Sequence, residues 1–191
     1  GSGKTLHSKF LASYLNKKKI KFIKLREPGG NINSERIRKL ILSNKSKFNK
    51  ITDLFLYLAA RNENLENLIR RNYKKKIIII DRFIDSTLAY QHYGMGIDYK
   101  LINYLNNYLT RNLKIDLTFL NLVNFKNLKK RLSKRKNLNR YDKFNIKFYK
   151  KVQDGYVKIS KYQKNKYKII DSNKTISENR QIIIKKVMSL L

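Results

Sequence analysis

Short apolar runs alternate with longer amphipathic stretches along the whole of this chain. Apolar runs with the length and composition of strands occur at Ile20–Leu25, Ile77–Ile80, Ile115–Val123 and Tyr167–Ile170. Helical periodicity covers residues 4–18, 34–43, 51–72, 86–92, 98–111, 125–136, 144–165 and 176–190. Strands that are separated by helices predict an α/β fold, in which helices cover both faces of a parallel sheet.

Length and composition limit the class of protein. A chain of 191 residues suits one domain, and neither an internal repeat nor a Pro/Gly/Ser-rich linker divides it. The absence of cysteine excludes a disulfide framework, a thiolate zinc site and a catalytic cysteine. No apolar run reaches the roughly 18 residues of a membrane span, and no signal-peptide pattern opens the chain. We therefore expect a cytoplasmic protein.

The charge is strongly basic, with 45 Lys and Arg against 13 Asp and Glu and a net charge of +32. Such an excess is typical of nucleic-acid-binding proteins. However, 33 of the 45 cations are Lys and 22 residues are Asn, whereas Ala occurs only four times. Because Lys and Asn have A/T-rich codons, drift in a low-GC genome explains most of the excess. A selected basic surface that binds nucleic acid stays an alternative.

The first five residues, Gly1-Ser2-Gly3-Lys4-Thr5, match the end of the phosphate-binding pattern G-x-x-x-x-G-K-[ST]. In such a P-loop, backbone amides surround the phosphates, Lys4 reaches the β- and γ-phosphates, and the Thr5 hydroxyl binds Mg²⁺. A flexible Gly/Ser-rich start is the plainer interpretation, but the helical spacing of the residues that follow favours the motif. The rest of the pattern and its strand would precede Gly1. We therefore expect a truncated fragment, weak or inactive, whose complete sheet has five strands.

Two further segments lie where predicted strands end. Asp81-Arg82 follows a buried strand, where an acid can hold Mg²⁺ or its water shell beside a P-loop and an arginine can grip a phosphate. The loop Arg26-Glu27-Pro28-Gly29-Gly30 contains the only proline of the chain. Ligands bind at the carboxyl ends of the strands in such sheets, so both segments are candidate site residues. A helix-capping Asp and an ordinary turn are the alternatives.

Polar and aromatic pairs recur at helical spacing near these loops. Tyr57 and Arg61 lie four residues apart, so they share one face of a helix and can offer a ring and a guanidinium to a base. The pairs Ser86/Tyr90 and Thr87/Gln91 form a polar stripe beside Arg82. A core tyrosine with a solvated arginine, and a solvent-facing helix start, are the alternatives.

Together these segments closely resemble the bacterial thymidylate kinases, over nearly the whole chain. The segments that carry the resemblance are GSGKT at residues 1–5, REPGG at 26–30, AAR at 59–61 and DRxxxSTxAYQ at 81–91. The resemblance implies a three-layer P-loop kinase fold in one domain over residues 1–191, with a small lid near residues 133–145. It also implies transfer of a phosphoryl group from ATP, with Mg²⁺, to dTMP in dTTP synthesis.

Site residues follow from the resemblance by position. Those implied to bind ATP are Gly1, Ser2, Gly3, Lys4, Thr5 and Asp171, and Thr5 and Asp81 would hold Mg²⁺ directly or through water. Those implied to bind dTMP are Glu27, Pro28, Tyr57, Arg61, Arg82, Ser86, Thr87, Tyr90 and Gln91. Arg82 would hold the phosphate, Arg61 would meet the thymine edge, and Tyr57 would stack on the base where the family usually has Phe. The peptide bond before Pro28 would be cis.

The resemblance assigns catalysis to Lys4, Arg82 and the lid arginines Arg135 and Arg140, and it leaves open which of the two lid arginines acts in the transition state. It also implies a homodimer formed by helices. Three alternatives remain: another nucleoside monophosphate or deoxynucleoside kinase, a P-loop relic without activity, and a basic nucleic-acid-binding protein.

Overall fold

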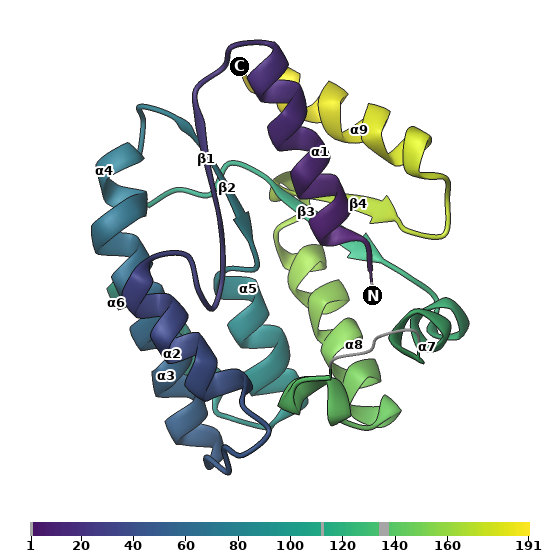
Figure 1. Ribbon diagram of the computed structural model, residues 1–191. Coiled ribbons are helices and arrows are strands. Elements are labelled where there is room, and N and C mark those ends of the chain that lie inside the picture. The colour runs from purple at the N-terminus through teal and green to yellow at the C-terminus, as the bar shows by residue number, and fades with distance from the viewer. Residues whose placement is uncertain (1, 112, 134–137) are drawn as a thin grey trace. The chain divides into compact units, whose positions relative to one another are not determined.

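The computed structural model describes residues 2–111, 113–133 and 138–191 (Figure 1). In chain order its elements are α1 (Lys4–Lys17), β1 (Phe22–Arg26), α2 (Ile32–Leu42), α3 (Lys50–Asn64), the π-helical segment η1 (Leu65–Ile69), α4 (Arg70–Asn72), β2 (Ile77–Asp81), α5 (Ile84–Thr87), the π-helical segment η2 (Leu88–Gly94), α6 (Tyr99–Thr110), β3 (Thr118–Leu122), α7 (Phe125–Ser133), the 3-10 turn η3 (Arg140–Lys143), α8 (Ile146–Tyr162), the 3-10 turn η4 (Lys164–Lys166), β4 (Tyr167–Asp171) and α9 (Ile176–Met188).

The predicted strands and helices are confirmed, with differences at their ends. The strand predicted at Ile115–Val123 is shorter, at Thr118–Leu122. The helix predicted at residues 86–92 begins earlier, at Ile84, and continues to Gly94 as a π-helical segment. A π-helix has more residues per turn than an α-helix, and the polar spacing that predicted this helix cannot distinguish the two.

The strands form two separate two-stranded sheets among the described residues, β1 with β2 and β3 with β4. β3 and β4 are parallel, with Thr118 opposite Tyr167 and Leu122 opposite Asp171. β1 and β2 run in the same direction in Figure 1. An α/β fold with parallel strands is therefore confirmed, whereas a single five-stranded sheet is not. The fifth strand of that prediction was expected before Gly1, outside this chain.

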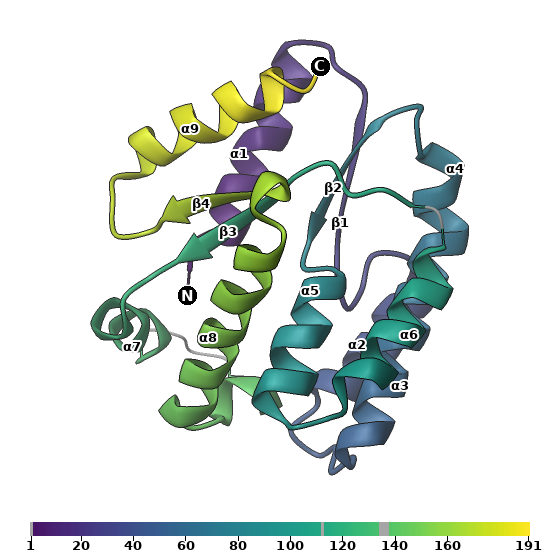
Figure 2. The ribbon, with the colours of Figure 1, turned by 180° about the vertical axis from the view of Figure 1, so that it is seen from behind.

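The described residues group into two units, and each is considered by itself. The first comprises residues 2–22, 115–133 and 160–191 of the described chain and contains the β3–β4 sheet. α1 and α9 lie side by side in this unit, as both views show (Figures 1 and 2). Leu15 of α1, Ile170 of β4 and Ile183 of α9 are fully or almost fully buried. The apolar side of each amphipathic element thus supplies the core of this unit.

The second unit comprises residues 23–114 and 138–159 and contains the β1–β2 sheet. Leu25, Leu65 and Ile69 form a buried cluster, against which pack Ile23, Ile78, Ile80, Phe83, Leu109 and Leu113. α2 lies against α3, and α3 also contacts α6. Among the described helices, none is long and apolar enough to cross a membrane.

Candidate active site

The loop that follows β1 carries three consecutive buried residues, Glu27, Pro28 and Gly29, and the peptide bond between Glu27 and Pro28 is cis, as the resemblance implied. Gly29 and Gly30 then have φ values of +109° and +125°, which side chains disfavour. Asn64 of α3 fixes this turn, because its Nδ2 donates to the Gly29 carbonyl at 2.6 Å. The glycines therefore let the loop lie directly against α3.

Arg61 is the centre of a buried hydrogen-bond network. It is 2% exposed, and its Nε donates to Glu27 Oε2 at 2.8 Å. Its Nη1 donates to Asn106 Oδ1 of α6 at 2.6 Å, and its Nη2 donates to Thr87 Oγ1 at 2.8 Å. Burial raises the pKa of Glu27, and the charge of Arg61 opposes that rise. The network joins the REPGG loop, α3 and the helix after β2 at one point.

Arg82 lies directly after β2, with a φ of +71° that is rare for a residue with a side chain. Its Nη2 donates to the Tyr90 hydroxyl at 3.1 Å, and its Nη1 donates to the Tyr156 hydroxyl of α8 at 3.2 Å. Tyr156 in turn donates to Ser86 Oγ at 2.7 Å. Burial raises the pKa of Tyr156 to about 12, so its hydroxyl keeps its proton. These partners hold the guanidinium in one orientation.

A second arginine, Arg38 of α2, lies near the same region. Its Nη1 donates to the Pro28 carbonyl at 2.6 Å. Burial lowers the pKa of Arg38, and the charges of Arg26 and Arg82 lower it further, with Glu35 acting in the opposite direction. Arg26 itself pairs with Glu35 at 3.2 Å. The positive charges of Arg26 and Arg82 act on Arg38, and such a concentration of positive charge makes this region favourable for an anion.

Tyr57 lies on α3, and Gln91 lies on the π-helical segment η2. Burial raises the pKa of Tyr57 to about 12, and its ring meets the Tyr141 ring edge-on at 5.8 Å between centroids. Gln91 is 1% exposed, and its Nε2 has no hydrogen-bond partner among the described residues. Because a buried unpaired amide is costly, this donor indicates a place for an acceptor atom of a ligand.

Asp81 ends β2, and its carbonyl accepts a hydrogen bond from the Glu27 backbone at 3.0 Å. Its carboxylate also interacts electrostatically with Arg82. Within the described ranges, no group of three or more His, Cys, Asp and Glu residues could hold a metal ion. A metal here would therefore rely on one or two protein oxygens together with ligand oxygens, as Mg²⁺ in phosphate sites does.

The P-loop residues lie in the first unit, at the start of α1. Gly3 has a φ of +82° and precedes the first helical residue, Lys4, whose Nζ donates to Ser2 Oγ at 3.2 Å. Thr5 lies in the first turn, which contains no acidic residue. The positive end of the helix dipole favours a bound anion at this position. Gly1 lies outside the described residues.

Asp171 ends β4 in the same unit. Its Oδ1 accepts hydrogen bonds from the Asn173 backbone and side chain at 2.9 and 2.7 Å, and these bonds lower its pKa. Ser172 then donates from Oγ to the Ser2 carbonyl at 2.8 Å, and its own carbonyl accepts from Arg131 Nη2 at 3.0 Å. The loop after β4 and the P-loop therefore meet at Ser172.

Of the two predicted lid arginines, the structure describes Arg140 and its contacts. Arg140 begins the 3-10 turn η3 and forms an ion pair with Asp53 of α3. Its Nε donates to the Ile41 carbonyl at 3.1 Å. Arg135 lies outside the described residues. The structure thus places Arg140 on protein partners of its own unit.

Most of the predicted site residues fall into two groups. The second unit brings together Glu27, Pro28, Tyr57, Arg61, Asp81, Arg82, Ser86, Thr87 and Tyr90 through the contacts described above. The first unit brings together Ser2, Gly3 and Lys4 at the P-loop and connects them to the loop that starts at Asp171. The structure thus connects residues of each group to one another, while the assignment of these residues to ATP or dTMP stays a prediction.

Five residues of these neighbourhoods were missed from the sequence: Arg38, Asp53, Asn106, Tyr141 and Tyr156. Asp53 had the best available signal, because an acid in a chain with only 13 Asp and Glu interrupts an otherwise apolar helical stretch. Arg38 and Asn106 lie in amphipathic helices rich in Arg, Lys and Asn, where nothing in the spacing distinguishes a buried polar residue from a solvated one.

Comparison with known proteins gives one consistent result. The family model described as "Thymidylate kinase" matches residues 1–183. The thymidylate kinase of Sulfurihydrogenibium sp. (strain YO3AOP1) is 39% identical over 96% of this chain and 90% of its own length. That of Thermosipho africanus is 37% identical, over 99% and 96%. The crystal structure of thymidylate kinase from Ehrlichia chaffeensis is 32% identical with a TM-score of 0.79, covering 98% of this chain and 93% of that one.

Proposed function

Because this chain belongs to the thymidylate kinase family, we propose that it transfers the γ-phosphoryl group of ATP to dTMP, yielding dTDP and ADP. The observation that carries the proposal is the network around Arg61, which connects three sequence motifs at one buried point. Glu27 comes from REPGG, Arg61 from the motif on α3, and Thr87 from the segment after Asp81-Arg82. A nucleic-acid-binding surface requires no such buried meeting point, since phosphate backbones are bound by exposed cations.

The phosphate of dTMP binds among Arg82, Arg38 and Arg26. Burial and the charges of Arg26 and Arg82 disfavour the positive charge of Arg38, and a bound dianion would favour it. Arg82 is already oriented by Tyr90 and Tyr156, so little conformational freedom is lost when it binds the phosphate. This fixed guanidinium lowers the energy of the transition state by holding the acceptor oxygen in line with the γ-phosphorus.

The thymine base lies near Tyr57 and Gln91. The Tyr57 ring provides a surface on which the base stacks, and the unpaired Gln91 Nε2 donates to a thymine carbonyl. Arg61 uses three N–H groups on Glu27, Asn106 and Thr87, which leaves two of its five for the base edge. Tyr90 and Ser86 lie on the same helical segment as Thr87, and Tyr90 packs against the sugar.

ATP binds to the P-loop residues at the start of α1. The backbone amides of Ser2 and Gly3, with Gly1, surround the phosphates, and Lys4 reaches the β- and γ-phosphates as a mobile positive charge. The loop that begins at Asp171 receives the adenine ring, and its contact with Ser2 through Ser172 connects the base and phosphate ends of the site.

Mg²⁺ fits the oxygen donors of this chain, because hydroxyl and carboxylate oxygens are its preferred protein ligands and it keeps phosphate and water ligands besides. Thr5 would hold it through the side-chain oxygen, and Asp81 directly or through water. When bound, the ion neutralises charge on the β- and γ-phosphates. No protein residue forms a covalent intermediate: a phosphate oxygen of dTMP forms the new bond to γ-phosphorus as the bond to the β-phosphate oxygen breaks.

The complete architecture is that of a P-loop kinase: one domain, a five-stranded parallel sheet between helical layers, and a lid near residues 133–145. Closure of the lid excludes water and brings an arginine to the transferring group. Arg135 and Arg140 are the two candidates for that arginine. A cytoplasmic location follows from the same proposal.

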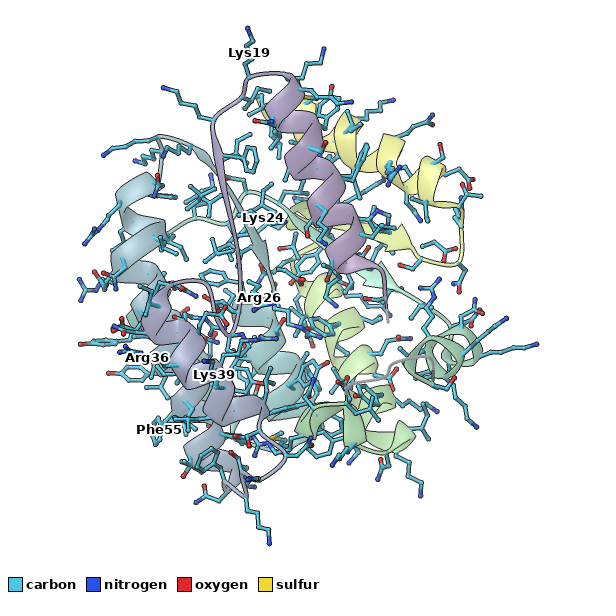
Figure 3. All side chains as sticks on the ribbon, viewed as in Figure 1. Lys19, Lys24, Arg26, Arg36, Lys39 and Phe55 are labelled. Carbon is cyan, nitrogen blue, oxygen red and sulfur yellow. The ribbon has the colours of Figure 1, made fainter. Side chains whose placement is uncertain are left out.

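The protein acts as a homodimer that associates through helices of the second unit. Large apolar side chains are exposed on neighbouring helices there, namely Ile32 and Leu40 of α2, Phe55 of α3, and Tyr104 and Tyr108 of α6. Figure 3 labels Phe55 on α3, and Arg36 and Lys39 on α2, which packs against α3. A monomer rarely exposes so many apolar side chains together. Sedimentation of the natural protein tests this, and a monomer at micromolar concentration would contradict it.

The central test uses two variants of the natural protein, Lys4→Ala and Arg82→Ala. Each is expected to lower kcat with ATP and dTMP by about 10³-fold or more, because each removes charge that acts on the transferring phosphates. Lys9→Ala on the exposed side of α1 and Arg71→Ala in α4 are matched controls that keep wild-type turnover. Normal activity of either active-site variant would defeat the assignment of these residues.

The alternatives are separated by comparing acceptors. We expect dTMP to be phosphorylated faster than dUMP, GMP and thymidine. A preference for GMP or thymidine would instead identify another nucleotide or nucleoside kinase. ATP binding without transfer to any acceptor would identify an inactive relic, and tight nucleic-acid binding with a steep salt dependence would support a nucleic-acid-binding protein.

A further inference from the structure

A carboxylate outside the proposed site, Asp53, connects α3 to two residues within the predicted lid, Arg140 and Tyr141. Asp53 lies in the first turn of α3 and is 3% exposed. Its Oδ1 accepts a hydrogen bond from Arg140 Nη2, and its Oδ2 accepts one from the Tyr141 hydroxyl at 2.7 Å. Both oxygens of one buried carboxylate therefore hold two consecutive residues that lie 87 and 88 positions further along the chain.

Arg140 is occupied by protein groups on more than one side. Besides Asp53, it donates from Nε to the Ile41 carbonyl at 3.1 Å, and its guanidinium lies 5.7 Å from the centre of the Phe48 ring. Asn139 caps the same turn in a reciprocal capping box with Asp142. An arginine held by the end of α2, by α3 and by its own turn is a structural anchor rather than a free cation.

Tyr141 is the residue that this anchor places. It is 7% exposed, and its carbonyl accepts a hydrogen bond from the Tyr149 hydroxyl at 2.8 Å. Its ring packs edge-on against Tyr57 at 5.8 Å and against Tyr90 at 6.1 Å between centroids. Tyr57 and Tyr90 are the two aromatic residues that the proposed function assigns to the base and the sugar. Movement of Tyr141 would therefore change the packing behind both.

We infer that Asp53 and Arg140 are a positioning pair that fixes Tyr141 against Tyr57 and Tyr90, and that Arg140 is not the transition-state arginine. This inference rests on the proposed function and adds two positioning residues to the dTMP site. Neither member of the pair touches the nucleotide. The pair acts on acceptor binding, because it determines where the two aromatic rings of the pocket lie.

The local electrostatics suit such a pair. Asp53 is close to the N-terminus of α3, where the helix dipole favours a negative charge, and Asn49 caps that helix through its side-chain oxygen. The side chain of Arg140 is 17% exposed and that of Asp53 is 4% exposed, so solvent screens the ion pair only weakly. A substitution that neutralises either partner leaves the other one charged and without its counter-ion.

Steady-state kinetics of the natural protein test this pair. Asp53→Asn and Arg140→Gln are each expected to raise KM for dTMP by about 10-fold, while kcat falls less than about 3-fold and KM for ATP is unchanged. The double variant is expected to resemble the single ones, because the two residues act as one unit. Asp154→Asn on α8 and Arg71→Gln in α4 are exposed controls expected to keep wild-type values.

If Arg140 acted in the transition state, its substitution would change kcat rather than KM for dTMP. Arg140→Gln would then lower kcat by about 10³-fold at an unchanged KM for dTMP, and this result would overturn the inference. Additive effects in the double variant would overturn it as well. If the wild-type protein did not phosphorylate dTMP, the proposed function itself would fail, and that result is distinct from both outcomes.

Tyr141→Phe keeps the test decisive if the charge variants do not fold. It removes the hydroxyl that donates to Asp53 and that is also hydrogen-bonded to the Tyr57 side chain, and it keeps the ring, so we expect the fold to be preserved. We expect KM for dTMP to rise about 3-fold with kcat unchanged, since these hydrogen bonds are lost. An unchanged KM for dTMP in a folded Tyr141→Phe variant would contradict the inference.

Discussion

Two arginine–carboxylate pairs meet on α3, and they differ in burial and in the parts of the chain that they join. In the pair Glu27–Arg61, the side chains are 4% and 2% exposed, and Arg61 has two further partners. In the pair Asp53–Arg140, the arginine side chain is 17% exposed. The first pair ties α3 to the sheet and α6, whereas the second ties it to a segment near the predicted lid.

This difference in burial suggests that the two ion pairs have different roles in the second unit. Arg61 lies in a network with no access to solvent, so the network fixes one arrangement and its loss affects the whole unit. Arg140 keeps some contact with solvent, so its pair can open at lower cost. We therefore expect the first pair to contribute mainly to stability, and the second mainly to the position of Tyr141 beside Tyr57 and Tyr90. The predictions below separate these two roles.

The largest effect is expected from Glu27→Gln, which leaves the Arg61 charge buried without its counter-ion. We expect the free energy of unfolding, measured by urea denaturation, to fall by about 3–5 kcal/mol. Glu66→Gln is the matched control, since its pair with Arg70 is exposed and contributes less than about 1 kcal/mol. A loss below about 1 kcal/mol in Glu27→Gln would show that the two pairs on α3 do not differ as described.

A smaller effect is expected from Asn106→Ala, which removes one partner of Arg61 and keeps the ion pair. The buried Nη1 then has no acceptor, and we expect a loss of about 1–3 kcal/mol in the same measurement. Asn107→Ala is the neighbouring control on α6. Equal stability of the two variants would mean that Arg61 does not depend on Asn106.

Asp53→Asn is expected to destabilise the protein less than Glu27→Gln, by about 1–2 kcal/mol, because solvent reaches Arg140 when its partner is neutral. Thermal unfolding of the two variants, measured side by side, gives the ranking directly. A larger loss in Asp53→Asn than in Glu27→Gln would reverse the comparison between the two pairs.

The smallest effect concerns the exposed pair Arg26–Glu35 of the same unit. Burial acts to raise the pKa of Glu35, but the Gly30 amide and Arg26 lower it below its usual 4.5 overall. A carboxylate with a lowered pKa stabilises the folded state above pH 4.5 and loses that contribution as the pH falls through its folded-state pKa. Glu35→Gln should therefore reduce the acid sensitivity of unfolding slightly. Identical pH profiles for variant and wild type would contradict the assignment.

The sequence predicted the elements of the fold because its apolar periodicity is clear. The runs that became β2 and β4 lie within one residue of their predicted positions. The element predictions depend on local spacing, which a single sequence shows directly. The resemblance to thymidylate kinases grouped Glu27, Arg61, Arg82 and Thr87 as residues that bind dTMP, and hydrogen bonds connect Glu27, Arg61 and Thr87 in the structure.

The partners that complete the site depend on long-range packing instead. Asn106 meets Arg61 from 45 positions away, and Tyr156 meets Arg82 from 74 positions away. In a chain with 22 Asn and 13 Tyr, nothing local distinguishes those two residues from the others. The contact of Asp53 on α3 with Arg140 was not predicted either, because the resemblance assigned Arg140 to catalysis in the lid and the two residues lie 87 positions apart.

The most direct test of phosphoryl transfer to dTMP follows the nucleotides by ³¹P NMR in a mixture of the natural protein, ATP, Mg²⁺ and dTMP. The proposed function predicts that ADP and dTDP appear in equal amounts while ATP and dTMP disappear, and that neither forms with Arg82→Ala. Consumption of ATP without dTDP, or no reaction although both nucleotides bind, would contradict it.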